Sequence, residues 1–217
     1  MPGRAAVWTR RDEVDEELLE QVRELTASEE AVLRTARTRA GSTVALPPPE
    51  IGSLLAWLAG TTGVQAAVEV GAAAGISGAW LVPALADKGV LTSIERDPHV
   101  HGLATDAFEA VGTGNRVRAI LGDPDEVLPR LSDGGYDLVL LQGSGFAGVD
   151  PLEHARRLLR TGGVLVARGV LRSGEHAEAR ARFVAAISDD PAFTATVLPV
   201  DDGLVLATRL ADEPDER

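Results

Sequence analysis

The sequence predicts an α/β fold: a Rossmann-like, doubly wound sheet of seven strands with an antiparallel hairpin at its carboxyl-terminal end. Five short apolar runs typical of strands follow one another at spacings of about 20–27 residues, with segments of helical length between them. Such spacing suits strand, crossover helix and parallel strand, in a sheet that helices cover on both faces. Two further apolar runs joined by Asp201-Asp202-Gly203 predict the hairpin.

Residues 1–46 are predicted to form a helical extension. Apolar side chains recur there at spacings of three and four, with acids on the opposite face, as at Val14, Leu18, Val22 and Leu25. A second helical stretch is expected to begin at an N-cap, Ser28, and Gly41 with the prolines 47–49 ends it. Two interpretations stay open: these helices pack on the following domain, or they pack on a second subunit.

Residues 47–210 are predicted to form the main domain. A helix through Ile51 and Leu58 leads into strands expected at 67–70, 90–94, 117–121, 138–141 and 164–166. Helices are expected between and after them at 77–86, 99–111, 126–131 and 152–159. A last helix through Phe183 precedes the hairpin runs 193–200 and 204–210. Residues 211–217 are predicted to be a disordered acidic tail.

Composition excludes several classes of protein. The 217 residues carry 21 basic and 33 acidic side chains, a net charge of −12, which argues against a nucleic-acid partner. No uncharged apolar run reaches the length of a membrane span, and residues 1–11 do not resemble a secretory signal. The chain contains no cysteine, so a disulfide or a thiolate nucleophile is impossible and a cytoplasmic location is expected.

The strongest local motif is a glycine-rich turn after the first predicted strand. Gly71 and Gly75 lie between that strand and the next helix, for which Ser77 is a plausible N-cap. In a doubly wound sheet, this turn borders the ligand site, and glycines allow the backbone to approach the ligand. Glu95 ends the second strand, 24 residues after Gly71. A carboxylate at that place can accept both hydroxyls of a ribose.

The turn favours a nucleoside ligand without a pyrophosphate. A dinucleotide site needs a middle glycine, and here that position is Ala73; no phosphate-binding loop occurs elsewhere. Glu69 adds negative charge beside the turn. A ligand with a ribose and a cationic end, S-adenosylmethionine (SAM), fits best. The alternative is that the glycines only form the turn and that Glu95 caps the next helix.

Several motifs carry a family resemblance from about Pro48 to Arg209. They are Pro48-Pro49-Glu50-Ile51-Gly52, the E-x-G-x-x-x-G-x-S turn, residues 91–98, Gly122-Asp123-Pro124, Tyr136-Asp137-Leu138-Val139 and residues 158–163. Together they resemble the class I SAM-dependent methyltransferases, specifically the catechol and caffeoyl-CoA O-methyltransferase-like group (bacterial O-methyltransferase family 3).

The resemblance implies a SAM site and a dimer formed through the amino-terminal helices. It implies that the methionine end of SAM is lined by Glu69, Gly71, Ala73, Gly75 and Ser77. It further implies that Glu95 holds the ribose with Arg96 beside it, and that Gly122, Asp123 and Pro124 flank the adenine. Gln142 would lie close to the sulfonium.

The chain departs from the family pattern at the metal site. Members of this group usually bind a divalent cation through an Asp after strand 4 and an Asp-Asn pair after strand 5. The matching positions here are Gln142, Arg168 and Gly169, so no metal is expected. The position of the family's catalytic lysine is Gly145, and Lys88, the only lysine, is expected at the opposite end of the sheet.

Two residues remain as candidates for catalysis. His154 follows Asp150 by four residues and would act as a general base oriented by it; alternatively, Asp150 caps a helix and His154 lies on the surface. Arg168 would bind an acidic acceptor or stabilise a phenolate or carboxylate. The alternative for Arg168 is a structural ion pair with Asp150 or a nearby glutamate.

The prediction is a SAM-dependent O-methyltransferase that acts without a metal on a hydroxyl or carboxyl group of a small molecule. Methyl transfer from a sulfonium does not strictly need a base, because holding the acceptor oxygen in line supplies much of the rate. The alternative function is a SAM-binding protein without catalytic activity that serves as a binding or regulatory module. Loss of all three metal-ligand positions favours that alternative.

Overall fold

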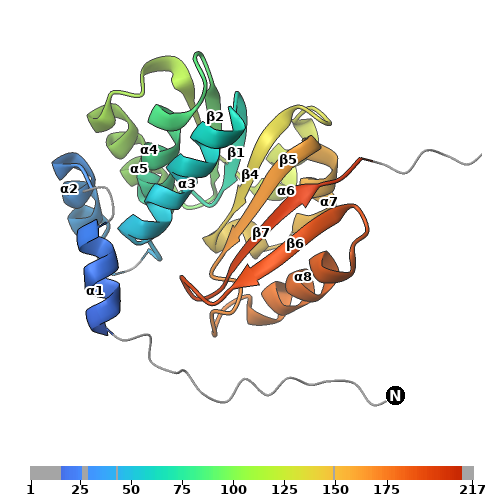
Figure 1. The fold of residues 1–217 in the computed structure, drawn as a ribbon. Coiled ribbons are helices and arrows are strands. Elements are labelled where there is room, and N and C mark those ends of the chain that lie inside the picture. Colours follow the sequence, from blue (N-terminus) through green and yellow to red (C-terminus); the bar gives the residue numbers. More distant parts are fainter. Residues whose placement is uncertain (1–15, 26–28, 43, 149, 212–217) are drawn as a thin grey trace, which may run out of the picture.

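The protein is described here by a computed structural model, which covers residues 16–25, 29–42, 44–148 and 150–211 (Figure 1). Three predictions fall at least partly outside the described residues. They are the N-cap at Ser28, the part of the helical extension before residue 16 and the disordered tail from residue 212. Among the described residues, no helix combines the length and apolarity that crossing a membrane requires.

Seven strands of the described chain form one sheet in the order β3-β2-β1-β4-β5-β7-β6. Their bounds are β1 Ala66–Val70, β2 Val90–Glu95, β3 Val117–Leu121, β4 Tyr136–Leu141, β5 Leu159–Arg168, β6 Phe193–Leu198 and β7 Leu204–Arg209. Strands β1 to β5 pair in parallel, whereas β7 runs antiparallel to both β5 and β6. The predicted doubly wound sheet with a terminal hairpin is therefore confirmed.

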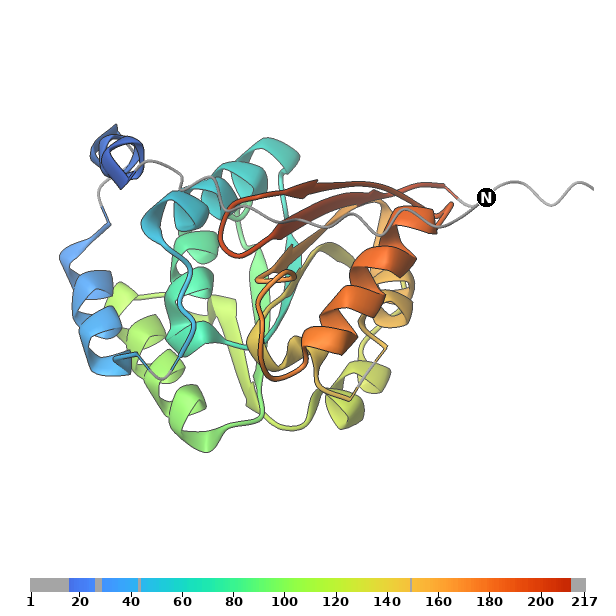
Figure 2. The same cartoon turned by 90° about the horizontal axis from the view of Figure 1, so that it is seen from below.

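Helices cover both faces of this sheet (Figures 1 and 2). Their bounds are α1 Glu16–Leu25, α2 Ala31–Ala40, α3 Pro49–Thr62, α4 Ile76–Ala84, α5 Pro98–Val111, α6 Pro124–Val127, α7 Pro151–Leu158 and α8 Ala177–Asp189. Helices α3, α4 and α5 pack on one face, where α3 contributes Ile51, Leu55 and Ala59 to the core. Helices α7 and α8 pack on the other face.

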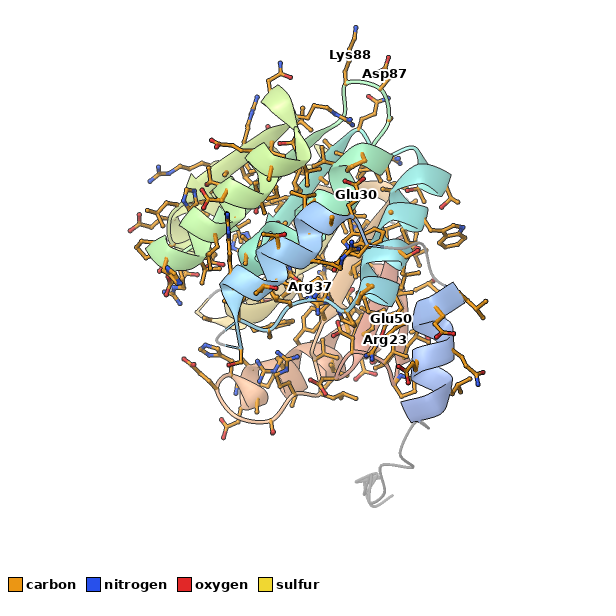
Figure 3. All side chains as sticks on the ribbon, turned by 90° about the vertical axis from the view of Figure 1, so that its left-hand side faces the viewer. Arg23, Glu30, Arg37, Glu50, Asp87 and Lys88 are labelled. Carbon is orange, nitrogen blue, oxygen red and sulfur yellow. The ribbon has the colours of Figure 1, made fainter. Side chains whose placement is uncertain are left out.

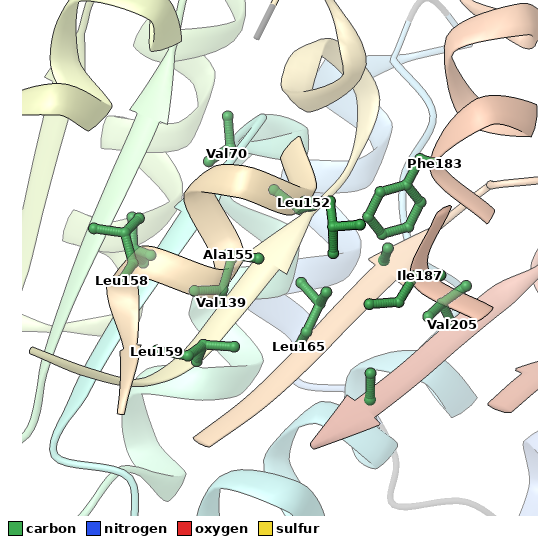
Figure 4. Close-up of a cluster of buried hydrophobic side chains, with 14 of the residues drawn as sticks. Val70, Val139, Leu152, Ala155, Leu158, Leu159, Leu165, Phe183, Ile187 and Val205 are labelled. Atoms are coloured by element: carbon green, nitrogen blue, oxygen red, sulfur yellow. The ribbon is translucent and has the colours of Figure 1, made fainter. Parts of the chain in front are cut away.

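The central strands are buried on both faces of the sheet, which explains why their sequences are nearly continuous apolar runs. Val139 of β4 and Leu165 of β5 meet Leu152 of α7 and Phe183 of α8 there (Figure 4). Side chains on a strand alternate between faces, so the neighbouring Leu138 and Leu140 enter the core under α3 and α4. Burial on both faces is typical of a parallel sheet.

Most element boundaries lie within a few residues of the predicted ones. Strand β5 is longer than the predicted run 164–166, because it extends through Leu159–Arg168. The helix predicted at 126–131 divides into the short α6 and the 3-10 turn Leu128–Arg130. The predicted N-cap Ser77 is wrong: Gly75 occupies that position, and Ser77 lies inside α4 with a buried side chain.

The described part of the amino-terminal extension packs on its own domain. Helix α2 is joined to α4 through the buried carboxylate of Glu29, which accepts hydrogen bonds from Arg37 Nε (2.8 and 2.9 Å) and from Trp80 Nε1 (3.4 Å). Helix α1 lies beside the start of α3, and Arg23 reaches to within 3.6 Å of Glu50 (Figure 3). On α1, however, the apolar side chain of Leu25 is 87% exposed.

Candidate functional site

The candidate site lies at the carboxyl edge of the parallel strands, where β1 leads into a tight crossover turn. The turn is closely packed: a Cβ on Gly71 would lie 2.1 Å from the carbonyl oxygen of Gln142, and one on Gly75 would lie 2.8 Å from that of Ala104. Both glycines also have positive φ, 86° and 80°. Ala73 and Ala74 adopt positive φ without being glycine, a strained conformation that clusters at functional sites.

Glu95 joins the end of β2 to this turn. Its Oε2 accepts a hydrogen bond from the Ala72 N–H at 2.9 Å, and its Oε1 accepts from the N–H groups of Arg96 and Asp97 at 2.9 and 3.0 Å. The residue that caps α5 is Asp97, so Glu95 does not serve as the helix cap. Because each carboxylate oxygen can accept two hydrogen bonds, Oε2 retains one acceptor position at the turn.

Glu69 is fully buried at the end of β1 within a polar network. Its carboxylate accepts hydrogen bonds from the hydroxyl groups of Ser77 and of Ser93 (2.7 Å for Ser93), and from Gln142 Nε2 at 2.9 Å. Burial raises the pKa of Glu69 from 4.5 to about 7, against the opposing effect of the two serines. Sequence reasoning missed Ser93; the available signal was a pair of polar residues, Thr92 and Ser93, in the middle of a buried strand.

Gln142 lies at the centre of the carboxyl edge of the parallel strands. Its Nε2 lies 2.8 Å from the carbonyl oxygen of Gly71 and 2.6 Å from Ser77 Oγ, while its Oε1 accepts a hydrogen bond from Arg168. The side chain is 2% exposed and fills the space between the turn and Glu69. The structure thus brings together four predicted site residues, Glu69, Gly71, Ser77 and Gln142.

Arg168 ends β5 and is bound by a carboxylate. Its Nε and Nη2 donate to the two carboxylate oxygens of Asp201 at 2.5 and 3.0 Å. Both side chains are nearly inaccessible, with 3% and 5% exposed. The open alternative of a structural ion pair is therefore what the structure contains, with Asp201 as the partner in place of Asp150.

The hairpin turn between β6 and β7 supplies Asp201. Strand β7 runs antiparallel to β5, so its first residue, Leu204, pairs with Arg168 and the turn lies at the carboxyl end of β5. Asp201 and Asp202 have positive φ, 51° and 54°, as this tight turn demands. Sequence analysis used Asp201 only as a turn signal and missed its contact with the site.

A second, exposed ion pair lies at the β2–β3 end of the edge. Arg96 Nη2 is 2.6 Å from Asp123 Oδ2, and the two side chains are 42% and 36% exposed. Asp123 also caps α6, because its Oδ1 accepts the N–H of Asp125 at 3.0 Å. Gly122 and Pro124 flank it after β3, so the residues predicted to border the adenine lie together.

His154 and Asp150 do not join this cluster. Asp150 caps α7 by accepting the N–H groups of Leu152 and Glu153, as the alternative interpretation expects. His154 is half-buried, and its Nδ1 has no hydrogen-bond partner. Burial, and secondly the charge of Arg157, lower the pKa of His154. Within the described chain, no hydrogen bond or ion pair joins His154 to Gln142 or Arg168.

The side chains at the positions that match the family's metal ligands suit an ion pair better than a bound metal cation. Gln142 offers one neutral amide oxygen, already bound by the guanidinium of Arg168, and Gly169 has no side chain. Among the described residues, no cluster of three His, Asp or Glu side chains is arranged to hold a metal ion. Lys88 lies in the turn before β2, at the opposite end of the sheet (Figure 3).

Comparison with known proteins gives the family. Residues 11–210 match the family model described as O-methyltransferase. The chain belongs to the O-methyltransferase family. A relative from Mycobacterium marinum, whose name provisionally assigns it to the O-methyltransferases, is 39% identical over 89% of this chain and 91% of its own. The predicted family and enzyme class are confirmed.

Two solved structures share the fold of this O-methyltransferase. A protein from Corynebacterium glutamicum is 28% identical, with a TM-score of 0.80 over 91% of this chain and 98% of its own. An O-methyltransferase from Bacillus cereus, solved in complex with SAH (S-adenosylhomocysteine), is 20% identical. Its TM-score is 0.80 over 89% of this chain and 97% of its own. The likeness confirms the predicted fold class.

Proposed function

We propose that this O-methyltransferase uses SAM to methylate a hydroxyl or carboxyl group of a small molecule, without a metal ion. The observation that carries the proposal is the position of Glu95. It ends β2, contacts the crossover turn through Ala72 N–H and keeps an acceptor position there. The Bacillus cereus relative, whose structure contains SAH, supports the choice of cofactor.

The charges at the turn fit a cationic cofactor. Glu69 and Glu95 are both buried there, and neither forms a salt bridge with a described residue. A positive sulfonium would be attracted by these two carboxyl groups, whereas a pyrophosphate would be repelled by them. When bound, SAM supplies a methyl group already activated by the positive charge on sulfur.

In this proposal, each group of site residues contacts one part of the cofactor. Glu95 holds the ribose, while Arg96, Gly122, Asp123 and Pro124 border the adenine. Glu69, Gly71, Ala73, Gly75, Ser77 and Gln142 line the methionine end. The protein accelerates transfer by orienting the acceptor oxygen, a contribution that can reach several kcal/mol.

Arg168 and His154 remain the proposed catalytic candidates, with different support. Arg168 touches Gln142 and is fixed by Asp201, so it can position the amide at the centre of the site. The lowered pKa of His154 keeps the imidazole neutral and able to accept a proton at pH 7. No hydrogen bond or ion pair joins His154 to the other site residues that the structure describes, and Arg168 is therefore the better supported of the two.

The cofactor proposal is tested by calorimetry with SAM and with SAH. The Glu95→Gln variant should bind either ligand at least tenfold more weakly, because a charge-assisted hydrogen bond to the ribose is lost. Glu109→Gln, on the exposed end of α5, is the matched control and should bind normally. Since Glu95 also holds backbone N–H groups, circular dichroism must show that the variant is folded. Absence of binding by the native protein, or unchanged binding by folded Glu95→Gln, would overturn the proposal.

A second candidate function is cofactor binding without turnover. It is favoured by the pairing of Arg168 with Asp201 and Gln142, which leaves the guanidinium little freedom to contact an acceptor. Transfer of labelled methyl from SAM to a panel of phenols and carboxylic acids separates the two functions. Turnover that persists with a chelator supports the metal-free enzyme, and chelator-sensitive turnover contradicts it.

We further propose a cytoplasmic homodimer with no nucleic-acid or membrane partner. The absence of cysteine supports the location, and the charge of −12 argues against nucleic acid. The family resemblance suggested the dimer. Light scattering and binding assays with DNA, RNA and vesicles test these points directly.

A further inference from the structure

Two N–H groups of the Arg168 guanidinium have no acceptor in the described protein. A guanidinium carries five N–H groups. Nε and Nη2 each donate one to Asp201, Nη1 donates one to Gln142, and no other described residue accepts from this side chain. One N–H on Nη1 and one on Nη2 therefore remain. Because Arg168 is only 4% exposed and buried N–H groups are nearly always paired, these two donors require an acceptor from outside the chain.

The ion pair with Asp201 fixes the position of these donors. Both carboxylate oxygens of Asp201 are bound, at 2.5 and 3.0 Å, so the planar guanidinium cannot turn without breaking one of these hydrogen bonds. Gln142, which accepts from Nη1, also donates to the carbonyl oxygen of Gly71 in the crossover turn at 2.8 Å. The unused donors therefore belong to a fixed group that is one side chain away from the proposed cofactor site, and an acceptor has to reach them there.

A methyl acceptor that has to lose a proton would find no suitable base beside Arg168. Among the described residues, no histidine or lysine forms a hydrogen bond or ion pair with Arg168 or Gln142. Asp201 is a weak base, because its ion pair with the guanidinium stabilises the ionised carboxylate. Glu69 has a suitable pKa of about 7, but its carboxylate is 0% exposed and is enclosed by three hydrogen-bond donors. The acceptor therefore has to arrive already ionised.

Of the hydroxyl and carboxyl groups in the proposed function, only carboxyl groups are fully ionised at pH 7, since their pKa is about 4 and that of phenols is about 10. Resting on that proposed function, we propose that the methyl acceptor is a carboxylate bound by the two unused N–H groups of Arg168, and that the product is a methyl ester. One carboxylate oxygen bonds to the methyl carbon, the methyl–sulfur bond breaks, and its electron pair stays on sulfur, which leaves SAH. No proton is taken up or released. A guanidinium suits this ligand, because it only donates hydrogen bonds and a carboxylate only accepts them.

Binding of a carboxylate to Arg168 is tested by calorimetry on the SAH-loaded protein with sodium benzoate and benzamide, which are similar in shape and differ in charge. Benzoate should bind at least tenfold more tightly than benzamide. Arg168→Gln together with Asp201→Asn removes both charges of the buried pair, so no buried charge is left alone, and should abolish this preference. Arg172→Gln, in the exposed pair with Asp202, is the matched control and should keep it. Equal binding of the two probes by the native protein, or an unchanged preference in the folded double variant, would overturn the proposal.

The chemistry of the product shows which group accepts the methyl. The native protein is given methyl-labelled SAM and a panel in which each carboxylic acid is matched by the corresponding phenol or alcohol, and the label should enter the acids. Alkali releases the methyl of an ester as volatile methanol, whereas a methyl ether resists it. In weakly buffered solution the reaction should release no proton, while ether formation releases one for each methyl transferred. Label that survives alkali, or no label on any acid, would contradict the proposal.

These results separate the acceptor class from the proposed function. If the protein binds SAM and forms only methyl ethers, the carboxylate acceptor is wrong and the methyltransferase function stands. If the protein binds neither SAM nor SAH, the proposed function itself fails.

Discussion

Two arginine–aspartate pairs lie at the same edge of the sheet, and they show how much burial changes an ion pair. Arg168–Asp201 is 3% and 5% exposed, makes two hydrogen bonds and also binds Gln142. Arg96–Asp123 makes one hydrogen bond and is 42% and 36% exposed. The buried pair is part of a continuous polar network, whereas water competes for the exposed one. Their chemistry is alike, and their energetic consequences should differ severalfold.

Breaking the buried pair should have the largest effect. Asp201→Asn leaves the guanidinium of Arg168 without its counter-charge in a dry environment and should lower the free energy of unfolding by about 3–5 kcal/mol. Asp202→Asn, which affects the exposed pair with Arg172, is the control and should cost less than about 1 kcal/mol. Urea denaturation measures both variants. Equal losses would show that burial does not distinguish the two aspartates.

Glu69 is buried like the Arg168–Asp201 pair, and its titration should make the free energy of unfolding depend on pH. Its pKa is about 7 in the folded state against 4.5 for the free group, so the folded state binds the extra proton between these values. Its contribution to stability is present below pH 4.5 and is lost as the pH rises toward 7, by roughly 3 kcal/mol in all. Glu69→Gln should flatten this part of the stability–pH curve. A curve with the native slope would show that other groups produce it.

In the exposed Arg96–Asp123 pair, Asp123 should stabilise the protein mainly as the N-cap of α6. Asp123→Ala removes both the cap of α6 and the ion pair with Arg96, and should lower the free energy of unfolding by about 1–2 kcal/mol. Asp123→Asn retains a capping oxygen and should recover most of that loss. Thermal denaturation of the two variants separates the contributions. If the Asn variant were as unstable as the Ala variant, the ion pair would contribute more to stability than the cap.

The smallest effect is expected from Arg96 itself. Arg96→Met keeps the cap at Asp123 and should change the free energy of unfolding by less than about 1 kcal/mol. Any difference from the native protein should shrink in 1 M salt, because solvent ions screen exposed charges. The Asp201→Asn effect should persist in the same salt. A large, salt-resistant loss at Arg96 would remove the contrast between the two pairs.

Sequence reasoning succeeded where a residue's neighbours are close in the chain. The crossover turn between β1 and α4, the acid at the end of β2 and the cap at Asp150 all follow local rules of backbone geometry. It was wrong about Ser77, since a serine before an apolar helix is typical of an N-cap, and only the packed turn shows that Gly75 holds that position. The hydroxyl of Ser77 is used by Glu69 instead.

The sequence by itself determined the order of the elements, the α/β sheet, the family and the residue types at the former metal positions. These follow from periodicity, turn chemistry and motif spacing, which act over short stretches of chain. Only the tertiary structure decided that Asp201, 33 residues after Arg168, is its partner, and that the carboxylate of Glu69 is dry enough for its pKa to approach 7. Both depend on which distant strand returns beside β5 and on how completely water is excluded there, and no local pattern in the chain encodes either quantity.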